Sequence, residues 1–507
     1  MQTKFEDLPF TLEALAQAYR DGARPADVVT EAFRRLDRTD DPGIFITTAH
    51  EEALREAEAL GAPDGRPLWG VPFAVKDNID VAGMPTTAAC KDFTYRAEAD
   101  AFVVAKLRAA GAICLGKTNL DQFATGLVGV RTPYPVPRNA IDPAIVPGGS
   151  SSGSAVAVAQ GIAAFALGTD TAGSGRVPAA LNSLVGLKTS LGALSASGVV
   201  PACRTLDTIS IFALTTGDAW RVFDVTAGFD GEDAYSRDFG AQSLAAPRMG
   251  MTIGVPDATT LKTFGDAAQE EAFRAALAML RGEGFTIAEL DFTPFYAVAD
   301  MLYEGAWVAE RVAAVGARLT DKPETLHPTT RAILEPGLKL SAVDAFEGMY
   351  RLKALQRACE AMLAAVDALC VPTIPTFVTM DEIAADPVGP NSMLGTYTNF
   401  VNLLDMCGIA VPTGMRGDGR PASVTFLAPA GQDALCAGLA VTVEAGALGA
   451  TGWDRPAQAL PMVEAAADEL QIAVCGAHMS DLPLNHELTS RGARLVRAHR
   501  TSPDYRF

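Results

Sequence analysis

The chain has 507 residues, of which 49% are hydrophobic and 20% are charged. This balance is typical of a folded globular protein, and the length allows about three domains or one large α/β core. Asp and Glu number 60 against 41 Lys and Arg, which gives a net charge of −19. The negative electrostatic field of such a protein repels polyanions, so no nucleic acid partner is expected.

The cysteine pattern and the apolar segments predict a cytoplasmic protein. The eight cysteines include no CxxC pair, and most lie in apolar surroundings, which favours reduced, buried thiols over disulfides or a metal site. The N-terminus lacks a basic region followed by an apolar run, so no signal peptide is expected. The most apolar stretch, at 155–168, contains Gln160 and is too short to cross a bilayer, so no membrane contact is expected.

In chain order, the hydrophobic pattern predicts alternating helices and strands. The N-terminal part is expected to contain helices at 11–20, 25–38 and 50–60, a strand at 71–75, a helix at 101–110 and a strand at 112–116. A Gly/Ser-rich loop at 148–154 then leads into a helix of small residues, a buried strand at 163–168 and a Gly-rich turn at 173–175. Further strands are expected at 251–255, 286–290, 367–372 and 409–412.

This alternation predicts an α/β fold with a mixed, largely buried central sheet covered by helices on both faces. One of the helices should begin after Asp266, and Gln269 three residues later predicts a variant of the capping box.

The composition shifts near the C-terminus and predicts a domain boundary. We expect a catalytic domain at 1–455 and a linker with a short helix at 456–470, rich in Ala, Pro and acidic residues. A strand is expected at 471–478. The segment 471–507 is too short to bury a core of its own, so we interpret it as the incomplete start of a second domain.

Two loops rich in glycine and serine are candidate sites, GGSSSGSAVAVA at 148–159 and GTDTAGSGRVPAA at 168–180. Each could be a simple turn, but both lead into apolar segments, and buried glycine-rich loops bring backbone N–H groups close to a ligand. Neither has the lysine of a phosphate-binding P-loop. GSSSG at 149–153 formally matches G-x-S-x-G with Ser151 as nucleophile, but of the five histidines only His327 is reasonably placed to be its base.

A lysine base is the alternative to histidine. Lys76 follows the apolar segment VPFAV, so its ammonium group should be partly desolvated. Burial disfavours the charged amine and lowers its pKa, which makes a lysine a usable base near neutral pH. An ordinary surface lysine at a strand end is the competing interpretation.

Four motifs together resemble the amidase signature family: GVPFAVKDN (70–78), GKTNLDQFA (116–124) and the two Gly/Ser loops. The likeness covers roughly residues 1–455. It implies the amidase-signature fold, no cofactor and no metal, and a triad in which Lys76 is the base, Ser150 the bridging serine and Ser174 the nucleophile. It also implies a cis peptide at Gly149–Ser150.

The same resemblance implies roles for the residues around Ser174. The backbone N–H groups of Thr171, Ala172, Gly173 and Ser174 would form the oxyanion hole. Thr169 and Asp170 would support the loop, and Arg176 is expected to form a structural ion pair. Lys188-Thr189 stands where the family often has Lys-Pro, a departure expected to affect only a turn.

Within this family, three stretches resemble the allophanate hydrolases: 121–129, 302–311 and 394–412; the tail at 476–507 resembles the opening of their C-terminal domain. The resemblance implies that Tyr303 and Arg311 hold the substrate, a small anionic amide, and an eight-residue spacing on one helix would let both lean toward one cavity. The implied reaction is hydrolysis of the terminal amide of allophanate, releasing ammonia. A homodimer and a functional link to a urea carboxylase are implied as well.

Two other hypotheses remain open from the sequence. The chain could be an amidase of the same mechanism that acts on another small amide. It could also be a catalytically silent, amidase-like binding protein, although the presence of Lys76, Ser150 and Ser174 argues against that.

Overall fold

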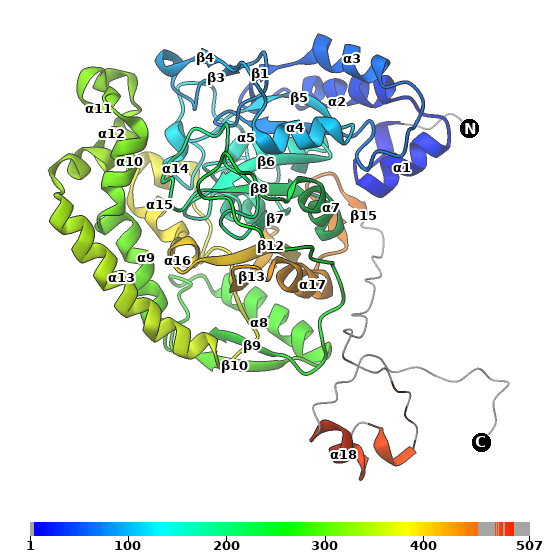
Figure 1. The fold of residues 1–507 in the computed structure, drawn as a ribbon, viewed down its shortest axis with the longest axis vertical. Coiled ribbons are helices and arrows are strands. Elements are labelled where there is room, and N and C mark those ends of the chain that lie inside the picture. Colours follow the sequence, from blue (N-terminus) through cyan, green and yellow to red (C-terminus); the bar gives the residue numbers. More distant parts are fainter. Residues whose placement is uncertain (1–4, 455–471, 473, 475, 480–481, 491–507) are drawn as a thin grey trace.

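The computed structural model describes residues 5–454, 472, 474, 476–479 and 482–490. At its centre lies an 11-stranded mixed sheet (Figure 1). Its strands, in spatial order, are β1 (Phe45–Thr48), β5 (Ile113–Thr118), β2 (Pro72–Lys76), β6 (Phe165–Asp170), β8 (Thr208–Ala213), β7 (Val185–Lys188), β12 (Met406–Met415), β13 (Pro421–Pro429), β11 (Ala368–Pro372), β9 (Thr252–Pro256) and β10 (Thr286–Leu290). Two short ribbons pair β3 (Pro85–Thr86) with β4 (Tyr95–Arg96) and β14 (Ala447–Leu448) with β15 (Trp453–Asp454).

The centre of the sheet is covered on both faces. Strand β2 runs parallel to both β5 and β6, whereas β6 and β8 are antiparallel. Every residue of β2, β5 and β6 is buried. Because successive side chains of a strand point to opposite faces, complete burial requires packing on both sides. The predicted α/β fold with a mixed central sheet is therefore confirmed.

The helices flank this sheet, and α9 to α13 gather at one side of the molecule, on the left in Figure 1. Their bounds are α1 (Leu12–Arg20), α2 (Pro25–Thr39), α3 (His50–Ala59), α4 (Phe102–Ala109), α5 (Ser152–Ala159), α6 (Val177–Leu181), α7 (Thr216–Thr226), α8 (Ala267–Gly282), α9 (Thr293–Glu304), α10 (Trp307–Val315), α11 (Arg318–Asp321), α12 (Pro328–Leu334), α13 (Ala342–Leu363), α14 (Met380–Ala385), α15 (Gly389–Leu394), α16 (Asn399–Leu403), α17 (Asp433–Val443) and α18 (Asn485–Thr489).

The strands expected from the sequence are all present up to residue 454, displaced by a few residues at their ends. The strand expected at 409–412 is the middle of the longer β12. Strands β1, β7, β8 and β13 of the central sheet were not predicted, since runs of this kind do not by themselves distinguish a strand from a helical segment. Lys188 therefore ends a strand and does not lie in a turn.

Two local predictions were wrong. Asp266 does cap α8 by accepting the N–H of Gln269, at 3.0 Å. The Gln269 side chain, however, donates to the carbonyl of Ile374 at 2.9 Å and accepts from Arg416, so the reciprocal half of the predicted capping box is not formed. Within the strand expected at 471–478, residues Gly476–His478 form a short 3-10 helix; the linker at 456–470 lies outside the described residues.

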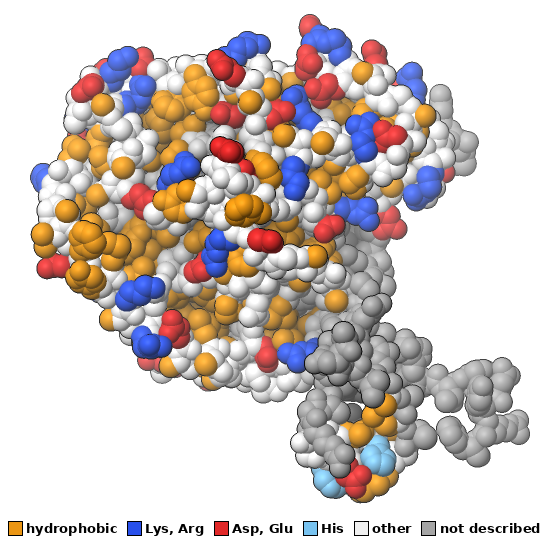
Figure 2. All heavy atoms as spheres, viewed as in Figure 1, with side chains coloured by type: hydrophobic (Ala, Val, Ile, Leu, Met, Phe, Trp, Pro, Cys, Tyr) orange, Lys and Arg blue, Asp and Glu red, His pale blue; other side chains and the backbone are white. Residues whose placement is uncertain are grey.

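The interior and surface agree with the composition. The seven described cysteines are free and buried, as expected, and Cys475 lies outside the described residues. None of the helices described here is both long and apolar enough to cross a membrane. Figure 2 shows acidic and basic side chains interspersed over the visible face, without one large basic patch.

Candidate active site

Lys76 is the last residue of β2, and its side chain is completely buried. Its Nζ lies 2.7 Å from Ser150 Oγ and 2.7 Å from Thr169 Oγ1, the two hydroxyls to which it donates. Burial lowers the pKa of Lys76 from 10.5 to about 7, although the negative charges of Asp121, Asp207 and Asp170 oppose the change. The predicted burial of this amine is confirmed, and the lowered pKa makes the uncharged amine accessible near neutral pH.

The first Gly/Ser loop places Ser150 beside this amine. The Gly149–Ser150 peptide is cis, as the family resemblance implied. The segment 121–129 packs directly on it: the Asp121 N–H donates to the Ser150 carbonyl at 3.1 Å, and the Gly149 N–H donates to the Leu127 carbonyl at 2.8 Å. A Cβ at position 149 would collide with the Asp121 carboxylate, so this close packing requires glycine.

Ser174 lies in the second loop, between β6 and α6, and is 2% exposed. Gly173 before it has a φ of +127°, and a Cβ there would collide with the side chain of Thr398. On the other side of Ser174, a Cβ at Gly175 would collide with Ser210. The two glycines therefore let a serine-bearing loop pack tightly at the end of a buried strand.

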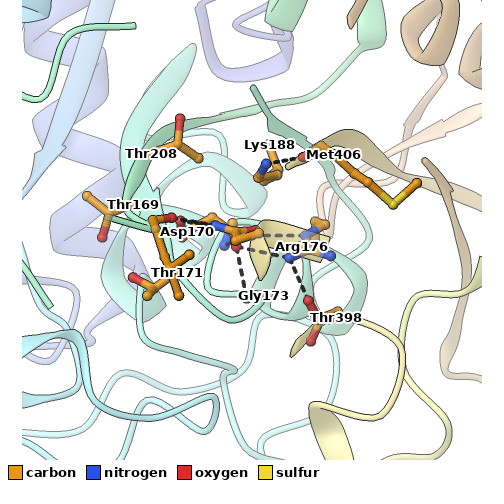
Figure 3. Close-up of polar contacts among 12 residues, drawn as sticks. Thr169, Asp170, Thr171, Gly173, Arg176, Lys188, Thr208, Thr398 and Met406 are labelled. Atoms are coloured by element: carbon orange, nitrogen blue, oxygen red, sulfur yellow. Dashed lines mark hydrogen bonds and ion pairs between the residues drawn. The ribbon is translucent and has the colours of Figure 1, made fainter. Parts of the chain in front are cut away.

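Asp170 anchors that loop through its carboxylate (Figure 3). Its carboxylate accepts the N–H of Gly173 at 2.9 Å and of Gly175 at 3.0 Å, and it pairs with Arg176 at 3.0 Å. Both charged side chains are fully buried, so the expected structural ion pair of Arg176 is confirmed. Despite burial, the charge of Arg176 holds the pKa of Asp170 below its usual value. Arg176 also donates to the carbonyl of Thr398 at 3.2 Å.

The hydrogen bonds within the loop limit which backbone groups remain free. The N–H of Gly173 is already donated to Asp170. Among the described residues, no acceptor contacts the N–H groups of Thr171, Ala172 and Ser174. These three groups are therefore the ones available to bind an oxyanion.

Two further buried lysines adjoin the site; sequence reasoning did not name Lys117, and it named Lys188 only as part of a turn. Lys117, in β5, pairs at 3.1 Å with the buried carboxylate of Asp77, the residue that directly follows Lys76 in the chain. Lys188, at the end of β7, donates to the carbonyl of Met406, and burial lowers its pKa to about 8. A buried, unbroken strand ahead of each lysine was the available signal, the same one that identified Lys76.

Tyr303 and Arg311 meet, but not on one helix as expected. Helix α9 ends at Glu304, Gly305 is extended, and α10 begins at Trp307. The two side chains still converge: Arg311 Nη2 donates to the Tyr303 hydroxyl at 3.3 Å, and the guanidinium lies 5.0 Å from the centre of the Tyr303 ring. Arg311 Nη1 also donates to Thr125 Oγ1 at 3.4 Å, which links it to the segment that packs on Ser150.

The histidine-based alternative has no geometric support. The hydroxyl of Ser151 exchanges hydrogen bonds with the backbone of Thr169, at 3.2 and 3.4 Å. His327 caps α12 by accepting the N–H of Thr329 at 3.3 Å. Among the described residues, no group of three or more His, Cys, Asp or Glu side chains is arranged to hold a metal ion.

A cavity of about 1200 Å³ lies elsewhere, between α1 and α7. It is lined in part by Tyr19, Trp69 and Asp218 and by none of the predicted site residues. Burial raises the pKa of Asp218 to about 7. The hydroxyls that contact the Lys76 amine, those of Ser150 and Thr169, do not line this cavity.

Comparison with known proteins decides the family. The amidase family model matches residues 27–437. The chain belongs to the amidase family. A model of the allophanate hydrolase C-terminal domain matches residues 470–507 of this amidase, in keeping with the predicted resemblance.

Homologues refine the likeness. The amidase is 44% identical to the urea amidolyase of Saccharomyces cerevisiae over 474 residues, which is 90% of this chain and 26% of that protein. It therefore spans about a quarter of the length of that relative. It is also 34% identical to one chain of the glutamyl-tRNA(Gln) amidotransferase of Nitratidesulfovibrio vulgaris, over 80% of this protein and 90% of that one.

Solved structures give the same picture. The urea amidolyase of Kluyveromyces lactis matches with a TM-score of 0.85 and 38% identity, covering 96% of this chain and 30% of that one. The Kluyveromyces lactis allophanate hydrolase matches with a TM-score of 0.82 and 38% identity, covering 95% of this chain and 81% of that one. The fold and the resemblance to allophanate hydrolases are confirmed by these matches.

Proposed function

We propose that this amidase hydrolyses the terminal amide of allophanate through Lys76, Ser150 and Ser174. The observation that carries the proposal is the fully buried amine of Lys76, 2.7 Å from the hydroxyl of Ser150, in a chain homologous to allophanate hydrolase. An uncharged amine there can accept the proton of Ser150, which in turn accepts the proton of Ser174.

The reaction then follows in two steps. Ser174 Oγ attacks the amide carbonyl, and the N–H groups of Thr171, Ala172 and Ser174 stabilise the oxyanion. The C–N bond breaks as the leaving nitrogen takes the relayed proton and departs as ammonia. Water, deprotonated by the same relay, hydrolyses the acyl-enzyme and releases N-carboxycarbamate. Thr169 and Asp170 support this machinery through their contacts with Lys76 and with the Ser174 loop.

Substrate recognition rests on Tyr303 and Arg311. A guanidinium binds a carboxylate through two parallel hydrogen bonds, and a tyrosine hydroxyl adds a further donor. Because allophanate carries a carboxylate next to a urea-like amide, this pair suits it better than a neutral amide. A urea-carboxylating activity is the class of reaction that would supply this substrate, and we propose the cytoplasm as the location of the protein.

A substrate panel tests the proposal. Ammonia release should be fastest with allophanate, slower with malonamate and slowest with acetamide. Equal or faster turnover of acetamide would favour an amidase of the same mechanism with another substrate. Ser174→Ala should abolish turnover and leave the circular dichroism spectrum unchanged; retention of a tenth of the wild-type rate would contradict its role as nucleophile. Binding of allophanate without ammonia release would favour a silent binding protein.

We also propose that the protein forms a homodimer through α13. Val343, Phe346 and Tyr350 lie on one face of this helix and are 65%, 54% and 70% exposed. In Figure 2, hydrophobic side chains gather over this part of the molecule, at the left edge. Exposed apolar side chains that cluster in this way mark an interaction surface.

The charges of α13 favour a second copy as the partner. Glu347 and Lys353 lie three residues before and after Tyr350, and neither forms an ion pair within the described chain. If two copies of α13 pack antiparallel around a two-fold axis at Tyr350, Glu347 of each copy faces Lys353 of the other. Gly348, on the opposite face of α13, lies against the α9–α10 break, since a Cβ there would come within 3.3 Å of Ala306. A dimer would therefore also support the segment that carries Tyr303 and Arg311.

A further inference from the structure

Within the part of the chain that the structure describes, two fully buried arginines have no carboxylate partner. Arg131 and Arg311 are each 1% exposed, and within the described residues neither forms an ion pair. The other buried arginines do: Arg35 pairs with a glutamate at 2.8 Å, and Arg176 and Arg416 pair with aspartates at 3.0 and 2.9 Å. Folded proteins rarely bury a guanidinium without an anion, because the charge loses its hydration.

The two unpaired guanidiniums converge on a single residue, Thr125. Arg131 Nη1 donates to the Thr125 carbonyl at 3.0 Å, and Arg311 Nη1 donates to the Thr125 hydroxyl at 3.4 Å. Arg131 Nη2 donates to the carbonyl of Pro387 at 2.8 Å, and Arg311 Nη2 to the Tyr303 hydroxyl at 3.3 Å. The Nε atoms of both arginines have no acceptor among the described residues. Since a guanidinium has five N–H donors, most donors of this pair are unused.

The electrostatics place the two charges within reach of each other. Burial lowers the pKa of Arg131, the carboxylate of Asp121 opposes this, and the positive charge of Arg311 adds to the lowering. The carboxylate of Asp121 acts on Arg131, but its two oxygens accept the backbone N–H groups of Gly129 and Arg131 at 2.9 Å. It therefore serves the fold of the segment and forms no ion pair with either guanidinium. Despite burial, the charges of Asp207 and Glu310 help to raise the pKa of Arg311, but these carboxylates accept hydrogen bonds from Thr171 and Thr205 and are not ion-paired with Arg311 within the described residues.

We propose that Arg131 joins Arg311 in binding the carboxylate of the substrate, with Thr125 positioning the two guanidiniums. This rests on the proposed function for the identity of the substrate, but the site itself requires only a small carboxylate. The anion supplies the missing partner for both buried charges, and its two oxygens use donors that the protein leaves unsatisfied. Two cations at one site favour a carboxylate over a neutral carboxamide of the same shape more strongly than one cation does.

The position of Thr125 connects this anion site to the catalytic serine. Thr125 follows Asp121 by four residues, and the Asp121 N–H donates to the Ser150 carbonyl. Gly126 after it has a φ of +159°, and a Cβ there would collide with the Asp121 carboxylate. The segment is thus hydrogen-bonded to Ser150 at one end and to the two arginines at Thr125. It sets where the carboxylate of a substrate lies relative to the amide that is cleaved.

Binding of malonate tests the proposal without requiring turnover. Malonate is a stable dicarboxylate of the size of allophanate, and malonamide is its neutral counterpart. We expect Arg131→Gln in the full chain to weaken malonate binding at least about tenfold, measured by calorimetry, and to leave malonamide binding unchanged. Arg138→Gln is the matched control, since Arg138 lies seven residues further on at the surface, and should change neither affinity.

Steady-state kinetics and a second pair of variants complete the test. With allophanate, Arg131→Gln should raise KM more than it lowers kcat, because the contact is made to the bound ground state as well as to the transition state. Thr125→Val, which removes the hydroxyl contact to Arg311, should weaken malonate binding, and Thr125→Ser should restore it. Equal malonate affinity of folded Arg131→Gln and wild type, or no malonate binding by wild type, would overturn the proposal.

The outcomes separate this inference from the proposed function. If wild type binds malonate in an Arg131-dependent way but does not hydrolyse allophanate, the anion site stands and the proposed reaction fails. If wild type hydrolyses allophanate and Arg131→Gln retains both KM and malonate affinity, the anion site fails and the reaction stands. If Arg131→Gln does not fold, equal malonate affinity of the two Thr125 variants overturns the proposal.

Discussion

The pKa of Lys76 offers a direct test of the proposed mechanism through Thr169→Val. Two hydroxyls accept hydrogen bonds from the Lys76 amine in the structure, those of Ser150 and Thr169, each at 2.7 Å. Valine has nearly the shape of threonine but cannot accept a hydrogen bond. Removing this acceptor destabilises the ammonium form more than the neutral amine, so the pKa of Lys76 should fall below its wild-type value of about 7.

The size of the shift follows from the energy of one hydrogen bond. A hydrogen bond to a charged group contributes about 1.5–3 kcal/mol, and 1.36 kcal/mol corresponds to about one pKa unit. Because the neutral amine also donates to Thr169, only part of this energy distinguishes the two protonation states. We therefore expect a shift of about one unit, to an apparent pKa of about 6.

The assay is ammonia release from allophanate, measured as kcat/KM between about pH 5 and 9. In the wild type, kcat/KM should fall about tenfold per pH unit below about pH 7, because the protonated amine cannot act as base. In Thr169→Val this acid limb should lie about one unit lower. Thr208→Val is the control, since the Thr208 hydroxyl contacts Thr189 at 2.8 Å. A wild-type profile that is flat in this range, or an acid limb that Thr169→Val moves to higher pH, would refute the reasoning.

Three other predictions concern stability and assembly. Asp170→Asn leaves the Arg176 guanidinium buried without a charged partner and should destabilise the fold by about 3–5 kcal/mol in urea unfolding followed by circular dichroism; a loss below about 1 kcal/mol would contradict this. Burial raises the pKa of Asp218 in the fold from its ordinary value of 3.8 to about 7, so ionisation of this carboxyl costs stability progressively from about pH 4 to 7. Asp218→Asn should therefore raise Tm more at about pH 8 than at about pH 4, and equal gains would count against the assignment. Phe346→Glu should convert a dimer to a monomer in light scattering, while Val388→Glu, at another exposed apolar residue, should not; an unchanged mass would exclude the α13 interface.

Much of the site could be located from local sequence signals. The apolar run before Lys76 predicted a buried strand and a partly desolvated amine, and the family resemblance decided against a surface lysine; the structure bears out the burial. Glycines around Ser150 and Ser174 predicted loops packed closely against other groups, because only glycine avoids the collisions found at positions 149, 173 and 175. The triad roles themselves came from the family resemblance and stay a prediction.

Other parts of the site could not be predicted because they depend on contacts between distant segments. The break between α9 and α10 at Gly305 separates Tyr303 from Arg311, and nothing in an amphipathic pattern distinguishes it from a continuous helix. Arg131 had no sequence signal at all. Arg131 is buried only because the fold packs Thr125, Pro387 and Arg311 around it, and its lack of a carboxylate partner is visible only in that packing.

The sequence by itself determined the class of fold and the positions of the serine loops, and the ordered family motifs decided between a buried and a surface Lys76. These features follow from periodicity, turn chemistry and ordered motifs, which act over a few residues. Only the tertiary structure decided which N–H groups near Ser174 remain free, which buried arginines lack a carboxylate, and which face of α13 is uncovered. Each of these depends on whether a polar or apolar group has a partner, and the partner lies in a segment that is remote in the chain.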